Sequence, residues 1–318
     1  MNRSLPFRRS QAVKLSRSGR TMNRMKRHWE LYLLVFLPVL YLIIFKYVPM
    51  AGVQIAFKDF NVVKGIWGSP WVSFKHFGTF FHSPNFWLLI RNTIGISVYS
   101  LLAGFPVPIL LALALNEVRT GPFKRSVQMI TYAPHFISTV VMVSIIILIL
   151  TPHVGVADRL FSLLGMKPTN FLGIPEFFKS IYVWSGVWQE MGYASIIYIA
   201  ALAGVDPSLY EAARIDGATR WKKIIHIDLP SLAPITIIML ILSLGSLMGV
   251  GFEKIYLMQN PLNSSSSEVI STYVYKVGLL GANFSFSSAV GLFNSVINLI
   301  LLLSVNFAAR KWSETSLW

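Results

Sequence analysis

The chain has 318 residues, of which 54% are hydrophobic and only 13% are charged, about half the charged share of an ordinary soluble domain. It contains no cysteine and six histidines, which excludes disulfide scaffolds, thiolate zinc sites and cysteine nucleophiles. The net charge is +15. In a soluble protein this excess of Lys and Arg would suggest nucleic-acid binding. The long charge-free apolar runs indicate a membrane protein instead. The distribution of Lys and Arg then indicates which segments face the cytosol.

Six apolar runs come close to the length of about 20 residues that a helix needs to cross the hydrocarbon core. They cover residues 31–48, 93–115, 127–150, 181–205, 231–252 and 284–309. The second and third contain prolines, which packed transmembrane helices tolerate when neighbouring groups satisfy the freed carbonyls. We therefore predict an all-α, polytopic membrane protein with six transmembrane helices.

The basic residues are distributed unevenly between the segments that connect these runs. Eighteen of the 28 Lys and Arg lie before the first run, between the second and third, between the fourth and fifth, or after the sixth. By the positive-inside rule these segments and both termini are cytosolic. Residues 1–30 are then a basic cytosolic tail, 31–309 the transmembrane domain and 310–318 a second tail. The first tail orients the first helix or, as an open alternative, binds anionic lipid.

The cytosolic connection over residues 204–230 has strong local signals. Asp206 can cap a helix whose first turn holds Pro207, and Gly217 stands where the chain must leave that helix with positive φ. Thr219 can cap a second short helix over 220–227, which Pro230 is expected to end. We predict two short helices around a glycine turn, with a mixed surface that suits a protein partner.

This connection also resembles a known motif, the EAA loop of the permease subunits of bacterial ABC importers. The resemblance rests on Glu211-Ala212-Ala213, on Asp216-Gly217-Ala218 and on the terminal Leu229-Pro230. Asn92-Thr93, Pro134 followed by Ser138, and the stretch 46–60 resemble the carbohydrate-uptake group of these permeases. The last stretch is most similar to the LplB-type oligosaccharide and polysaccharide permeases.

The resemblance implies a type I ABC-importer permease in the bacterial cytoplasmic membrane. Residues 204–230 would be a coupling element seated in a cleft of an ATP-hydrolysing subunit, with Glu211 facing a basic group and Gly217 permitting the turn. The implied coupling residues are Glu211, Ala212, Ala213, Asp216, Gly217 and Ala218.

The implied partners are a second related permease chain, a dimer of ATP-binding subunits, an extracytoplasmic solute-binding lipoprotein, an oligosaccharide and membrane lipid, but no nucleic acid. The sequence has no GxxxxGK[ST] loop to cradle phosphates. We therefore expect no bound cofactor and no enzymatic activity in this chain, with ATP and Mg²⁺ held by the partner ATPase.

A sugar path needs polar and aromatic side chains on the inner faces of the helices. The candidates are Trp188, Gln189, Glu190 and Tyr193 in the fourth run, and Asn294 and Asn298, spaced i and i+4, in the sixth. Glu190 could instead form an interhelical pair, and the asparagines could pack helices together.

Two further segments carry structural expectations. Small residues in the fifth run are expected to permit close helix approach; they are Ser243, Gly245, Ser246 and Gly249. Residues 263–267 are expected to form a flexible tip.

Other functions stay open at this point. The chain could be an ABC permease for a solute other than a sugar, or a stand-alone secondary transporter in which Glu190 couples transport to an ion gradient. An integral-membrane enzyme is the third class, although no nucleophile or acid–base motif stands out.

Overall fold

The computed structural model describes residues 27–163, 165 and 167–312, so that most of the predicted amino-terminal tail and residues 313–318 lie outside the described residues. The chain divides into two compact units, residues 1–54 and 55–318. Within the described residues the secondary structure is helical and holds no strand, only a single antiparallel bridge between Lys58 and Trp71. The all-α prediction is confirmed.

The described part of the first unit is one long apolar helix. It consists of α2 (Trp29–Leu42), a π-helical turn η1 (Ile43–Tyr47) and α3 (Val48–Met50), and the 3₁₀ turn η2 (Ala51–Phe57) leads into the second unit. Every residue from 27 to 51 is exposed. An apolar helix that is exposed on all sides is the surface expected of a segment surrounded by lipid.

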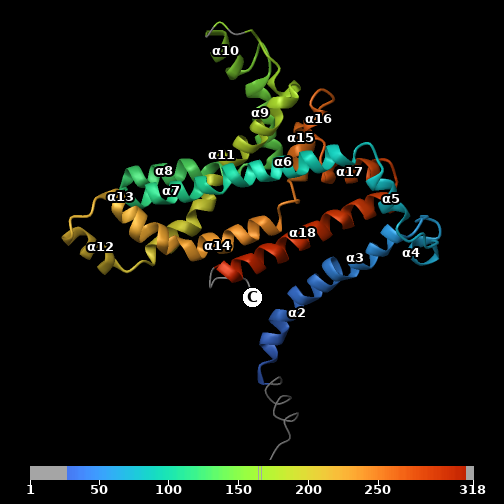
Figure 1. The fold of residues 1–318 in the computed structure, drawn as a ribbon, viewed down its shortest axis with the longest axis horizontal. Coiled ribbons are helices and arrows are strands. Elements are labelled where there is room, and N and C mark those ends of the chain that lie inside the picture. Colours follow the sequence, from blue (N-terminus) through green and yellow to red (C-terminus); the bar gives the residue numbers. More distant parts are fainter. Residues whose placement is uncertain (1–26, 164, 166, 313–318) are drawn as a thin grey trace, which may run out of the picture. The chain divides into compact units, whose positions relative to one another are not determined.

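Five helices of the second unit pack together, with α6 and α7 joined end to end (Figure 1). They are α6 (Phe86–Gly104), α7 (Pro106–Glu117), α11 (Pro175–Ala203), α14 (Leu229–Gly245) and α18 (Phe284–Trp312). α6 and α7 form a continuous apolar stretch of 32 residues, because Pro106 lies in the first turn of α7, where its missing N–H is tolerated. α11 packs against α6, α7 and α14, and α14 packs against α18.

The third predicted helix is broken, so the prediction of one continuous helix over 127–150 is wrong. The chain forms α8 (Pro122–Tyr132), a 3₁₀ turn η3 (Ala133–Phe136) and α9 (Thr139–Leu150), with a bend of 103°. Pro134 in η3 removes a backbone donor, and Ser138 begins α9 by accepting a hydrogen bond from Val141 N at 3.4 Å. α9 leads into α10 (Val156–Leu163) and the 3₁₀ turn η4 (Phe171–Gly173).

The expectation that Pro230 ends the second short helix is also wrong. α13 (Arg220–Lys223) continues through a π-helical turn η5 (Ile224–Asp228) into α14, giving 26 continuous helical residues. In η5 the N–H of Leu229 bonds to Ile224 O, one residue further back than in an α-helix. Pro230 then lies at the start of an α-helical segment, where it is tolerated. α14 ends at Gly245, before the predicted 252, and a non-helical segment leads to α15 (Phe252–Met258).

The remaining elements are short, except for the last helix. α4 (Gly65–Gly68) and α5 (Lys75–Phe81) precede α6, while α16 (Ser264–Ser267), α17 (Ile270–Tyr275) and the π-helical turn η6 (Lys276–Leu280) precede α18. The prediction of a flexible tip over 263–267 is wrong, because Asn263 and Ser267 are fully buried. Asn263 Nδ2 donates to Leu172 O at 2.8 Å, which fixes this turn to η4. The last helix, α18, begins at Phe284, as predicted for the sixth apolar run.

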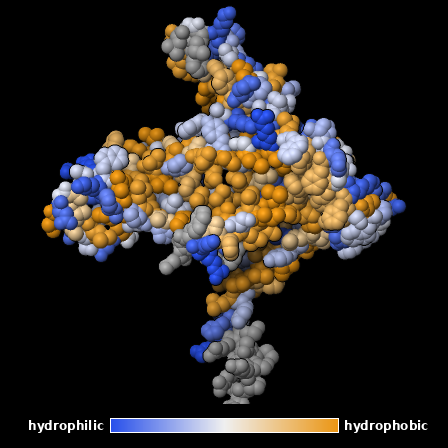
Figure 2. All heavy atoms as spheres, viewed as in Figure 1, coloured by the Kyte–Doolittle hydropathy of each residue, from blue (hydrophilic) through white to orange (hydrophobic). Residues whose placement is uncertain are grey.

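The number of membrane-crossing segments follows from length and composition. Among the described residues, four helical stretches are long and apolar enough to cross a bilayer, and two bent pairs of helices raise the count to six if each pair is one span. The predicted count of six lies within this range. Figure 2 shows apolar side chains over the long helices of the second unit and polar side chains gathered around α12 and α13, in the segment predicted to be cytosolic.

Candidate functional site

The segment 204–230 forms the predicted helix–turn–helix. α12 (Pro207–Ile215) is capped by Asp206, whose Oδ1 accepts a hydrogen bond from Ser208 N at 2.9 Å. Gly217 ends the helix with φ of +70°, and Ala218 N donates to Ala213 O at 2.8 Å. This pair of features is a Schellman-type helix end, which favours glycine at the left-handed position.

The helix–turn–helix is fastened to two membrane helices. The Tyr210 hydroxyl donates to Asp228 Oδ1 at 2.5 Å, and Asp228 is fully buried beside α14. Burial, together with this hydrogen bond to a carboxylate, raises the pKa of Tyr210 to about 12. Lys223 and Arg220 lie 3.5 and 3.9 Å from the carboxylate of Glu117 at the end of α7. These contacts connect α12 and α13 to α7 and α14.

The opposite surface of the same segment is open. Ile215 is 86% exposed and Trp221 74% exposed, and the charged Glu211 and Arg214 of α12 are exposed as well. Of the six predicted coupling residues, Glu211, Ala212, Asp216 and Gly217 are exposed and Ala213 and Ala218 are half-buried. Large exposed apolar side chains among charges are typical of a surface that binds another protein.

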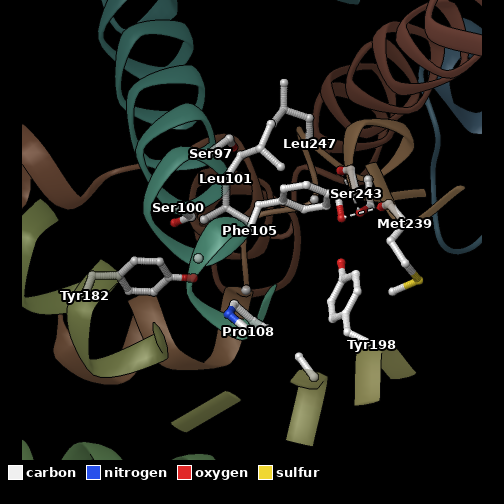
Figure 3. Close-up of a pocket in the computed structure, with 16 residues that line it drawn as sticks. Ser97, Ser100, Leu101, Phe105, Pro108, Tyr182, Tyr198, Met239, Ser243 and Leu247 are labelled. Carbon is white, nitrogen blue, oxygen red and sulfur yellow. Dashed lines mark hydrogen bonds between the residues drawn. The ribbon is translucent and has the colours of Figure 1, made fainter. Parts of the chain in front are cut away.

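A cavity of about 390 Å³ lies between α6, α7, α11 and the end of α14. Its volume is in the usual range for small-molecule sites. Six hydroxyl-bearing side chains line it: Ser97, Ser100, Tyr182, Tyr198, Ser243 and Ser246. Figure 3 shows the Tyr182 and Tyr198 hydroxyls directed into this space, with the Phe105 ring between α6 and Ser243. We call this space the hydroxyl cavity.

The lining of the hydroxyl cavity suits a polyhydroxylated ligand. Ser97 lines the cavity, although its Oγ is buried and forms no hydrogen bond with any of the described residues. Aromatic faces and hydroxyl groups in one cavity can bind both the apolar and the polar surfaces of a sugar ring. Sequence reasoning missed Ser97 and Ser100, and assigned Ser243, Gly245, Ser246 and Gly249 to close helix approach. Gly245 fits that assignment, since a Cβ there would meet Leu302 of α18, while the other three line the hydroxyl cavity.

A second cavity of about 370 Å³ adjoins the first, and both are lined by Ser100, Tyr182 and Gly251. We call it the charged cavity, because Glu190 and Lys254 both line it, together with Gln189 and Thr139. Two of the predicted cargo residues, Gln189 and Glu190, therefore lie at a cavity wall. Lys254, in the first turn of α15, was not singled out from the sequence.

Three predicted cargo residues of α11 contact the bend between α8 and α9. Gln189 Nε2 donates to Ile137 O at 3.0 Å, and Glu190 Oε2 lies 2.9 Å from His135 Nδ1. The Tyr193 ring stacks on His135 with centroids 3.8 Å apart. These contacts fit the interhelical alternative for Glu190. The fourth, Trp188, is 45% exposed and lines neither cavity.

The asparagines of α18 bind backbone. Asn298 Oδ1 accepts a hydrogen bond from Met248 N at 2.9 Å, and Asn294 Nδ2 donates to Met248 O at 3.4 Å. Neither lines the two cavities, so their contacts match the packing alternative. Their position matters to the site nonetheless, because Leu247 and Gly249, on either side of Met248, line the hydroxyl cavity.

Known proteins are similar to this chain in sequence and in fold. Protein LplB of Bacillus subtilis (strain 168) is 43% identical over 297 residues, covering 93% of each chain. The polygalacturonan/rhamnogalacturonan transport system permease protein YteP of the same organism is 43% identical over 288 residues, covering 91% of this chain and 90% of that relative.

A chain in the crystal structure of a bacterial ABC transporter involved in the import of the acidic polysaccharide alginate superposes with a TM-score of 0.85 at 41% identity. The superposition covers 92% of this chain and 99% of the solved one. These similarities extend over nearly the whole chain and are joined by a family match over residues 104–314. The chain therefore belongs to the family of binding-protein-dependent transport system inner membrane components.

Proposed function

We propose that this chain is a membrane-spanning subunit of an ATP-driven importer and forms half of the path for an oligosaccharide. The relatives include a polygalacturonan/rhamnogalacturonan permease and an importer of alginate, which supports a carbohydrate cargo. In this proposal the chain lies in the bacterial cytoplasmic membrane with six spans and both termini in the cytosol. It binds no nucleotide itself; ATP and Mg²⁺ are bound by a dimer of partner ATPase subunits.

One observation carries the proposal. α11 and α14 line the hydroxyl cavity, and the segment 204–230 joins the end of α11 to the start of α14. A partner that grips α12 and α13 therefore moves two walls of the cavity at once. ATP-driven closure of the partner subunits would tilt these helices and alternate the access of the cavity between the two sides of the membrane.

The remaining partners follow from the family and from geometry. One solved relative was crystallised in complex with an alginate pentasaccharide-bound periplasmic protein, which supports delivery of cargo by an extracytoplasmic binding protein. One chain carries one helix–turn–helix, so a symmetric ATPase pair needs a second permease chain. That second chain would close the cavities from the side that this chain leaves open.

The test is reconstitution of the whole transporter in proteoliposomes, with ATP hydrolysis and oligosaccharide uptake measured together. Glu211→Lys reverses the charge on the exposed face of α12 and should abolish uptake at unchanged folding. The matched control is Glu176→Lys, since Glu176 lies at the opposite end of α11. Uptake that persists with Glu211→Lys would contradict the coupling role. Uptake by this chain alone in a proton or sodium gradient would support the secondary-transporter alternative.

A further inference from the structure

The charged cavity contains a buried lysine that forms no direct ion pair with any of the described residues. Lys254 is 9% exposed and its Nζ donates to Tyr182 O at 2.9 Å. Nζ also lies 4.8 Å from the centroid of the Tyr182 ring. Among the residues that the structure describes, no carboxylate lies within the 4.0 Å of an ion pair with Lys254.

This arrangement is costly unless something else supplies a negative charge. A buried ammonium loses most of its hydration, which a single carbonyl and one aromatic face replace only in part. Lysine has three donors, and one of them is used by Tyr182 O. The space around Nζ is kept by Gly186, where a Cβ would come within 3.2 Å of the nitrogen.

Glu190 acts on Lys254 electrostatically across the charged cavity but does not contact it directly. Glu190 lines the same cavity, but its carboxylate oxygen lies 2.9 Å from His135 Nδ1. Glu253, beside Lys254 in the chain, is exposed. The cavity therefore holds an ammonium group with unused donors, and the one carboxylate that shares its lining is hydrogen-bonded to His135 instead.

We infer that Lys254 binds a carboxylate of the cargo, so that the transporter selects acidic oligosaccharides such as those built of uronic acids. The inference rests on the proposed function. A uronate is ionised at neutral pH, and its carboxylate would satisfy both the charge and the remaining donors of Lys254. The hydroxyl cavity alongside would hold neighbouring sugar rings. A neutral sugar would leave the ammonium unpaired, which gives discrimination against it.

The experiment compares acidic and neutral cargo in the complete reconstituted transporter with its binding protein. The probes are radiolabelled oligogalacturonate and oligoalginate, and the same oligosaccharides with their carboxyl groups reduced to alcohols. Lys254→Met should lower uptake of the acidic probes by about tenfold or more, as expected for a lost charge-assisted hydrogen bond, and leave uptake of the reduced probes within about twofold. Lys254→Arg should keep the preference. Each variant is compared with the wild type on the same binding protein, so the selectivity of that protein cancels.

Lys58→Met is the matched control for loss of a buried ammonium. Lys58 is 2% exposed, donates to Ile66 O at 2.7 Å and lies 4.7 Å from the Trp71 ring, but it lines neither cavity. Its loss should lower the uptake of acidic and reduced probes equally.

A second test separates cargo binding from a long-range partnership with Glu190. If Lys254 only balances the charge of Glu190, the double variant with Lys254→Met and Glu190→Gln should take up the acidic probes as well as the wild type. That result would overturn the inference. Equal loss of acidic and reduced probes in Lys254→Met would overturn it as well. A wild-type transporter that carries neither kind of probe would instead contradict the proposed carbohydrate function itself.

Discussion

Replacement of Gly217 by alanine tests how the helix–turn–helix is built. Gly217 has φ of +70°, and a Cβ added there would meet no atom within 4 Å. The cost of Gly217→Ala is therefore backbone strain alone, about 1–2 kcal/mol for an L-residue in the left-handed region. That energy corresponds to an increase of about 5- to 30-fold in the local opening of the turn.

The measurement is amide hydrogen exchange of α12 and α13, made alongside ATP hydrolysis and uptake by the reconstituted transporter. Opening of the turn should release the Schellman hydrogen bonds to Ala213 and Arg214, so exchange at Ala218 and Gly217 should accelerate. We expect hydrolysis to continue and uptake to fall. Gly217→Asn should lower uptake less than Gly217→Ala, because asparagine tolerates positive φ better than alanine.

Gly65 provides the control. It has φ of +65°, also with no atom within 4 Å of an added Cβ, but it is the first residue of α4, far along the chain from the segment 204–230. Gly65→Ala should carry a similar local strain without uncoupling hydrolysis from uptake. Unchanged exchange in Gly217→Ala would refute the backbone argument, and equal uncoupling by Gly65→Ala would refute the assignment of the effect to the coupling segment.

Three further changes test the packing that surrounds the site. Gly192→Ala should greatly reduce the amount of folded protein extracted in detergent, since its Cβ would meet the backbone of Thr131, whereas Gly291→Ala in open space should not. The pKa of Tyr210 lies at about 12 rather than its ordinary 10.0, so the unfolded chain ionises first and stability should fall between pH 10 and 12. Tyr210→Phe should reduce that fall in a pH series of thermal melts. Asn298→Leu should cost about 1–3 kcal/mol by leaving Met248 N unpaired, as measured by thermal unfolding in detergent.

The helices could be predicted from the sequence because apolar runs and local caps are short-range signals. Asp206, Gly217 and Thr219 act on backbone groups within a few residues, so the sequence placed the ends of α12 and the start of α13 correctly. Both predictions at prolines were wrong. The sequence predicted a continuous helix across Pro134, where the helix breaks, and a helix end at Pro230, where the helix continues. A proline removes one donor in either case, and whether the helix survives depends on the register of the preceding turn and on packing that lies elsewhere in the chain.

The cavities could be predicted only in part. Gln189 and Glu190 were found because polar residues within an apolar run are conspicuous, but Lys254 follows the run and looks like an ordinary interfacial lysine. Its burial depends on Gly186 and Tyr182 of α11, about 70 residues earlier. The asparagines were placed correctly on one face of α18, yet their partner, the backbone of Met248, is exposed to them only because α14 ends early.

The early end of α14 also links the segment 204–230 to the hydroxyl cavity. A helix that continued to residue 252 would satisfy its own backbone and leave Asn298 without a donor to bind. Because the chain leaves the helix at Gly245, Asn298 and Asn294 hold Met248, and this non-helical segment forms a cavity wall that α18 fixes in place. In the proposed mechanism, α14 tilts with α12 and α13 at one end while its other end pivots at this fixed segment. Such a pivot next to the hydroxyl cavity would convert a small movement of the segment 204–230 into a change in the shape of the cavity.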